Sequence, residues 1–249
     1  MEGNDNRCRE RRSIGFHVDG TFAEYVSVPS RSVQKLPESV PFELGSIMGC
    51  AVATAYHATE IGGVTPSDCV VVFGAGGVGL HAILWAQVRG ARKILAVDVI
   101  DRQLEAATEY GADVTLNPEA VDVLEAIENG TNGWGADVAI ECSGSPKAMR
   151  QAIEAVQADH GYESGTVVSV GVQPEPDEIG FNDLREGAFK ISGDHTRAEL
   201  DEIISIVSDG TVDLDASVTH HLPLEDINEA IRLIEDDSER VGRIVIDPT

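Results

Sequence analysis

The spacing of apolar positions changes regularly along the chain. Between about Cys69 and Asp194, short apolar runs rich in β-branched residues alternate with segments whose apolar residues recur at helical spacing. This alternation is typical of β-α-β units, in which helices join parallel strands. The predicted strands are Cys69–Phe73, Lys93–Asp98, Val114–Leu116, Asp137–Glu141, Thr166–Gly171 and Phe189–Gly193. The predicted helices are Val78–Arg89, Arg102–Tyr110, Val121–Glu128, Pro146–Ala158 and Ala198–Ser208. Together they predict one α/β domain with a doubly wound parallel sheet.

The two flanks have a different pattern. Gly20–Val28 and Gln34–Pro37 have the composition of short strands bounded by turns. Near the other end, Glu225–Glu235 is an amphipathic helix pattern that leads into an apolar strand pattern at Gly242–Ile246. We expect the two flanks to form a second domain together.

A glycine-rich turn follows the first predicted strand. Residues 74–79 read GAGGVG, which places the spacing GxGxxG between an apolar strand and a helix, the context that a dinucleotide-binding turn requires. Gly74 allows a tight turn, Gly76 lets the backbone approach a pyrophosphate, and Gly79 lets the helix pack closely on the strand. Gly77 precedes the helix predicted to begin at Val78, and the unpaired N–H groups at the start of that helix favour phosphate.

An acidic residue ends the second predicted strand, where a dinucleotide-binding site has one for the ribose. Asp98 ends the second predicted strand, nineteen residues after Gly79, and can accept hydrogen bonds from the hydroxyls of an adenosine ribose. Its negative charge would repel the 2′-phosphate of NADP, so the sequence predicts NAD as the cofactor. Arg102 lies four residues further on and would partly offset that charge.

The composition limits the partners. The formal net charge of -25 is spread along all 249 residues and argues against nucleic acid or an anionic membrane as a partner. No apolar run reaches the roughly 18 residues of a membrane helix, and the polar start, Met1–Arg12, is unlike a signal peptide. We therefore expect a cytoplasmic protein. The many acids and few lysines also resemble proteins adapted to concentrated salt, so we expect a halophilic protein.

Several stretches resemble, in the same order, the zinc-dependent medium-chain alcohol dehydrogenases. They are DGTFAEY (19–25), GCAVATAYH (49–57), GGVGLH (76–81), RQLEAA (102–107), YGAD (110–113), ECSG (141–144), VSVGV (168–172), LPLEDIN (222–228) and GRIVI (242–246). The resemblance implies an NAD-binding Rossmann domain at 52–194, together with part of a GroES-like, β-rich catalytic domain. Residues 1–51 would be the C-terminal portion of that catalytic domain, and residues 195–249 would return to it.

The resemblance also implies roles for single residues. Cys50 matches a ligand of the catalytic zinc, and Thr54 matches a residue that packs beside the nicotinamide. Val170, Gly171 and Val172 match backbone that holds the carboxamide of the cofactor.

Two further matches concern the flanks. Arg243 matches an arginine that contacts the pyrophosphate. Cys8 matches the last of four structural-zinc cysteines, here without its three partners. Other zinc-binding motifs of the family, which precede the matched region, are absent. We expect Met1 to be an internal start within a longer natural enzyme, with a truncated gene as the alternative.

The expected function is zinc-dependent hydride transfer between a small alcohol or polyol and NAD, by a partial chain whose own activity is open. One alternative is a noncatalytic NAD-binding remnant. Another is a zinc-free quinone or enoyl reductase of the same superfamily, which Cys50 and Asp98 disfavour. The resemblance further implies a homodimer or homotetramer, and it does not choose the substrate.

Overall fold

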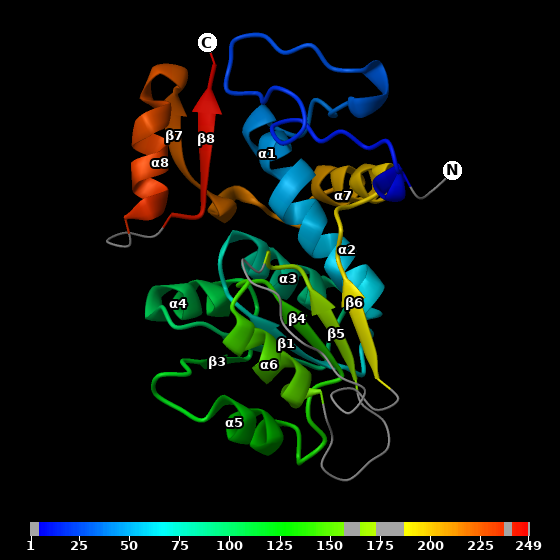
Figure 1. The fold of residues 1–249 in the computed structure, drawn as a ribbon, viewed down its shortest axis with the longest axis vertical. Helices are drawn as coiled ribbons and strands as arrows, with labels where there is room; N and C mark the ends of the chain where they lie inside the picture. Colours follow the sequence, from blue (N-terminus) through cyan, green and yellow to red (C-terminus); the bar gives the residue numbers. More distant parts are fainter. Residues whose placement is uncertain (1–4, 157–164, 173–186, 237–240, 249) are drawn as a thin grey trace. The chain divides into compact units, whose positions relative to one another are not determined.

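The chain folds into two compact units, which we describe separately. The computed structural model describes residues 5–156, 165–172, 187–236 and 241–248 (Figure 1). Unit 1 comprises Met1–Ala53 and His195–Thr249, and unit 2 comprises Thr54–Asp194.

Unit 2 is built on a six-stranded parallel sheet with the order β3-β2-β1-β4-β5-β6 (Figure 1). The strands are β1 (Cys69–Phe73), β2 (Lys93–Val97), β3 (Val114–Leu116), β4 (Val138–Glu141), β5 (Thr166–Ser169) and β6 (Ala188–Ile191). The order reverses direction between β1 and β4, which is the arrangement of a doubly wound sheet. The predicted Rossmann sheet is therefore confirmed.

Helices cover the sheet and make its central strands fully buried. They are α3 (Gly77–Val88), α4 (Asp101–Glu109), α5 (Val123–Gly130) and α6 (Pro146–Ala155). A further helix, α2 (Ala53–Gly62), comes before them in the chain. Every residue of β1 is buried, which explains its continuous apolar sequence. On one face, Val71 and Phe73 share a cluster with Ile127 of α5 and Met149 of α6. The end of the predicted helix Pro146–Ala158 lies outside the described residues.

Unit 1 contains short helices and one parallel strand pair. They are α1 (Phe42–Ile47), a π-helical turn η3 (Met48–Val52), α7 (Arg197–Ser208), β7 (Val218–Pro223), α8 (Ile227–Glu235) and β8 (Arg243–Asp247), with 3-10 turns η1 (Asp5–Arg7), η2 (Ser30–Ser32), η4 (Asp215–Ser217) and η5 (Leu224–Asp226). A capping box formed by Thr196 and Glu199 starts α7. The Gln34 side chain donates a hydrogen bond to the Arg197 carbonyl over 3.1 Å, which holds the segment around Gln34 against the start of α7.

The strands predicted at Gly20–Val28 and Gln34–Pro37 were wrong. Neither segment forms a strand, although Gly20–Val28 contains β-favouring residues. A strand exists only where a partner strand supplies its hydrogen bonds. These segments pair with none of the described strands, and Phe22 and Tyr25 are 69% and 89% exposed.

Candidate functional site

The glycine turn joins β1 to α3 in a conformation that only glycine tolerates well. Gly74 has a φ of +88°. A Cβ at Gly79 would lie 1.8 Å from the Gly74 carbonyl oxygen, so the helix can approach the turn only without a side chain there. Gly76 caps the N-terminus of α3, and a Cβ built on it meets nothing within 4 Å. The turn thus leaves open backbone beside the positive end of a helix, which suits a phosphate.

Asp98 lies directly beside this turn. Its Oδ2 accepts a hydrogen bond from the Ala75 N–H over 2.7 Å, and its Oδ1 accepts one from the Ile100 N–H over 2.9 Å. The carboxylate therefore holds the glycine turn against the end of β2, a role that sequence reasoning missed. Each oxygen keeps a lone pair for a further donor. Arg102 is half-buried in the first turn of the following helix, α4.

The ends of β4 and β5 form a second group of loops beside the turn. The N–H groups of Val170 and Gly171 donate to the Glu141 carbonyl over 2.8 and 2.9 Å, so the segment expected to hold the carboxamide lies against the end of β4. A Cβ on Gly74 would lie 2.8 Å from the Ser143 nitrogen. Val172 ends this described segment and is exposed.

Glu141 is at the centre of these loops and was not among the predicted site residues. Its side chain is fully buried. Its Oε1 accepts hydrogen bonds from the N–H groups of Ser143 and Gly144, over 2.7 and 2.9 Å, and from the Ser143 hydroxyl. The available signal in the sequence was an acid that ends an apolar strand.

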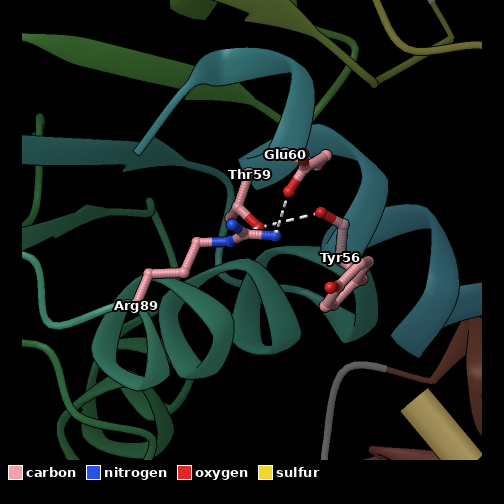
Figure 2. A network of polar contacts seen from close by, with 4 residues as sticks. All are labelled: Tyr56, Thr59, Glu60 and Arg89. Atoms are coloured by element: carbon pink, nitrogen blue, oxygen red, sulfur yellow. Dashed lines mark hydrogen bonds and ion pairs between the residues drawn. The ribbon is translucent and has the colours of Figure 1, made fainter. Parts of the chain in front are cut away.

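Thr54 is half-buried in the first turn of α2, the helix that Figure 2 shows docked on α3. Arg89, at the C-terminus of α3, donates from Nε to the Thr59 hydroxyl over 3.0 Å and from Nη2 to Glu60 over 2.7 Å. Its guanidinium also lies 5.0 Å from the centre of the Tyr56 ring. Arg89 therefore fixes the helix that carries Thr54, a link that sequence reasoning missed.

The predicted zinc residues lie in unit 1 and are both exposed. Cys50 is carried by the π-helical turn η3, a local structure that often marks functional sites. Cys8 follows the 3-10 turn η1. Within the described ranges, no three His, Cys, Asp or Glu side chains are grouped closely enough to hold a metal ion. Arg243, the first residue of β8, also belongs to unit 1.

Two other cysteines belong to the sheet. Burial, followed by the neighbouring Asp137, raises the pKa of Cys69 from 9.0 to about 11. Burial, followed by the neighbouring Glu141, raises the pKa of Cys142 well above its usual range. Both thiols are therefore unreactive at neutral pH.

The chain is similar to known dehydrogenases over most of its length. The family model described as "Zinc-binding dehydrogenase" matches residues 77–208, more than half of the chain. The L-threonine 3-dehydrogenase of Symbiobacterium thermophilum is 32% identical over 99% of this chain and 69% of its own length.

Solved structures agree. The 2R,3R-butanediol dehydrogenase of Bacillus subtilis superposes with a TM-score of 0.87 at 29% identity, over 100% of this chain and 70% of that one. The alcohol dehydrogenase of Thermus sp. ATN1 gives 0.82 at 30% identity, over 92% of this chain and 65% of that one. The chain thus spans about two thirds of the length of these proteins.

These likenesses and the sheet order confirm the predicted fold class. In the described part of the chain, no helix is both long and apolar enough to cross a membrane. From the family match and the identity to the threonine dehydrogenase, the chain belongs to the zinc-dependent medium-chain alcohol dehydrogenase family.

Proposed function

We propose that unit 2 binds NAD across the carboxyl ends of β1 and β4, and that the chain serves an oxidoreductase that transfers hydride between a small alcohol or polyol and NAD. The observation that carries the proposal is the glycine turn held by Asp98. The open backbone around Gly76 fits a pyrophosphate, and the carboxylate beside it fits the hydroxyls of a ribose. When bound, the nicotinamide ring supplies the acceptor or donor of the hydride.

Different residues would bind different parts of the cofactor. The backbone of residues 74–79 (Gly74, Gly76, Gly77, Val78 and Gly79) binds the pyrophosphate. Asp98 binds the adenosine ribose and disfavours the 2′-phosphate of NADP, with Arg102 offsetting part of that effect. Thr54 and the backbone of Val170, Gly171 and Val172 orient the nicotinamide, and Arg243 adds a donor for the pyrophosphate.

The zinc part of the proposal concerns Cys50 alone. A catalytic zinc needs three protein ligands, and the described residues do not bring three together. We therefore propose Cys50 as one of the ligands of that zinc ion. Cys8 alone would not hold a structural zinc.

A matched pair of glycine variants tests the cofactor site. Gly76→Ala adds a methyl group that meets nothing in the protein, so it should leave the melting temperature unchanged. The same methyl group would block the pyrophosphate and weaken NAD⁺ binding at least about tenfold. Gly79→Ala forces the Gly74 carbonyl aside and should lower both stability and affinity. Unchanged NAD⁺ affinity in Gly76→Ala would remove the proposed site.

Titration of the 249-residue chain with NAD⁺ and NADP⁺, followed by an alcohol dehydrogenase assay with added zinc, separates the functional readings. We expect tighter binding of NAD⁺. Turnover of an alcohol or polyol would support the enzymatic reading, whereas binding without turnover would favour a noncatalytic NAD-binding module. A quinone or enoyl reductase would instead prefer NADPH and need no zinc.

We further propose a cytoplasmic, salt-adapted homodimer or homotetramer. The acidic composition supports salt adaptation. The edge strand β6 supports association, because among the described strands it pairs only with β5, and because Ile191 is 76% exposed. Light scattering after size exclusion in molar KCl tests the oligomer, and a monomer at all concentrations would contradict it.

A further inference from the structure

Glu141 combines complete burial with one carboxylate oxygen that has no hydrogen-bond partner among the described residues. Among the described acidic residues it alone is fully buried. Oε1 accepts three hydrogen bonds from Ser143 and Gly144, whereas Oε2 is enclosed and accepts none from the residues that the structure describes. A buried acceptor without a donor costs stability, and a buried negative charge costs more. Most buried polar groups in native proteins are hydrogen-bonded, so a buried oxygen that is not calls for an explanation.

The Glu141 carboxylate lies between two closely packed loops, residues 143–144 and residues 170–172. A Cβ on Gly171 would lie 2.7 Å from Glu141 Oε2 and 2.2 Å from the Gly144 nitrogen. Gly144 in turn has a φ of +72°, and its Cβ would lie 2.5 Å from the Val172 carbonyl oxygen. The backbone at residues 170–172 therefore rests on the loop that Glu141 Oε1 holds. A shift of this carboxylate would move both loops.

Anchoring the loop does not by itself require a negative charge. The neutral amide oxygen of a glutamine could accept the same N–H donors as Oε1. The contacts among the described residues therefore explain neither the second carboxylate oxygen nor the negative charge.

Glu141 and Asp98 lie at the ends of strands on opposite sides of β1. Asp98 directly follows β2, which pairs with β1 on one side, and Glu141 ends β4, which pairs with β1 on the other side, where the strand order reverses. A dinucleotide that crosses this point with its adenosine at Asp98 places its other nucleotide on the side of β4. In NAD⁺ that nucleotide carries a positive ring, and in NADH the ring is neutral.

Resting on the proposed function, we propose that Glu141 is a positioning residue for the nicotinamide half of the cofactor: it fixes the backbone at residues 170–172, and its buried charge favours NAD⁺ over NADH. Charge attraction acts through a poorly screened interior, so it reaches beyond direct contact. The adenosine half, held at Asp98, is independent of it.

Glu141→Gln tests both parts, because it keeps an acceptor for the loop and removes the charge. The affinities of the full chain for NAD⁺, NADH and ADP-ribose are measured by calorimetric titration. We expect NAD⁺ binding to weaken about three- to tenfold more than NADH binding. ADP-ribose, which lacks the nicotinamide, should bind within about twofold of the unchanged chain.

Two further variants keep the test decisive. Glu154→Gln removes one charge from an exposed position on α6 and should change none of the three affinities by more than about twofold. If Glu141→Gln does not fold, Ser143→Ala removes one donor to Oε1 while the charge stays. It should weaken NAD⁺ and NADH equally, by about two- to threefold, and leave ADP-ribose unchanged.

The outcomes separate this inference from the proposed function. Equal weakening of all three ligands by Glu141→Gln, or no change in the ratio of NAD⁺ to NADH affinity, would overturn the role of Glu141 while leaving the cofactor site intact. A loss confined to ADP-ribose would overturn it as well. Failure of the unchanged chain to bind either NAD⁺ or ADP-ribose would instead overturn the proposed function.

Discussion

Replacing Arg89 with alanine removes three contacts that hold α2 against α3 (Figure 2). The hydrogen bond to the buried Thr59 hydroxyl is worth about 1 kcal/mol. The guanidinium over the Tyr56 ring adds about 0.5–1 kcal/mol. The ion pair adds at most about 0.5 kcal/mol, since the Glu60 side chain is 54% exposed. We therefore expect Arg89→Ala to destabilise unit 2 by about 2 kcal/mol.

Thermal unfolding followed by circular dichroism measures this loss. For a chain of this size, about 2 kcal/mol corresponds to a fall in melting temperature of roughly 4–8 °C. Glu60→Gln is the matched control because it removes only the ion pair, and it should cost under about 1 °C in molar KCl. Arg89→Lys keeps the charge without the planar donors and should fall between the two.

Comparing Arg89→Ala with Glu60→Gln separates the ion pair from the contacts of Arg89 with Thr59 and Tyr56. If the two variants lose equal stability, the ion pair dominates and the assigned contributions of Thr59 and Tyr56 are wrong. If the stability loss of Arg89→Ala disappears in molar KCl, Arg89 stabilises the chain by long-range charge attraction and not by its short contacts. A loss that persists in salt supports the close contacts.

Two further predictions concern pH and salt. Because the pKa of Cys69 is raised in the folded chain, its contribution to stability is complete below pH 9 and is lost as the pH rises to about 11, by roughly 2–3 kcal/mol. Urea unfolding at pH 8 and pH 11 should show this loss, and Cys69→Ala should reduce it. The net charge of -25 predicts a melting temperature that rises from dilute buffer to molar KCl. A chain equally stable in both would contradict the proposed salt adaptation.

The sheet of unit 2 could be predicted because its signals are local. β1 and β3 have the predicted bounds, and the other strands differ at their ends by one or two residues. A strand that is buried on both faces is a continuous apolar run, which can be recognised in the sequence without knowing its neighbouring strands. The glycine turn is equally local, since its spacing reflects the geometry of one strand–turn–helix unit.

The features that could not be predicted depend on distant partners. The segment Gly20–Val28 has the composition of a strand, but only a neighbouring strand would make it one. Arg89 binds Thr59, thirty residues away, and no periodicity indicates that pairing. Glu141 could be located at the end of a strand, but its two-loop contact requires Gly144 and Gly171 to be brought together by the sheet.

The contacts of the basic side chains explain why salt should strengthen this chain. Several of them bind backbone carbonyl oxygens. Lys93 Nζ donates to Gly130 O at the end of α5 over 2.9 Å, and Lys190 Nζ donates to Ile61 O near the end of α2 over 2.6 Å. Arg197 likewise donates to Arg31 O over 2.8 Å. Short bonds to carbonyls are weakened little by salt, whereas repulsion among the exposed acids is screened within about 10 Å at 0.1 M. We therefore expect added salt to remove more repulsion than attraction.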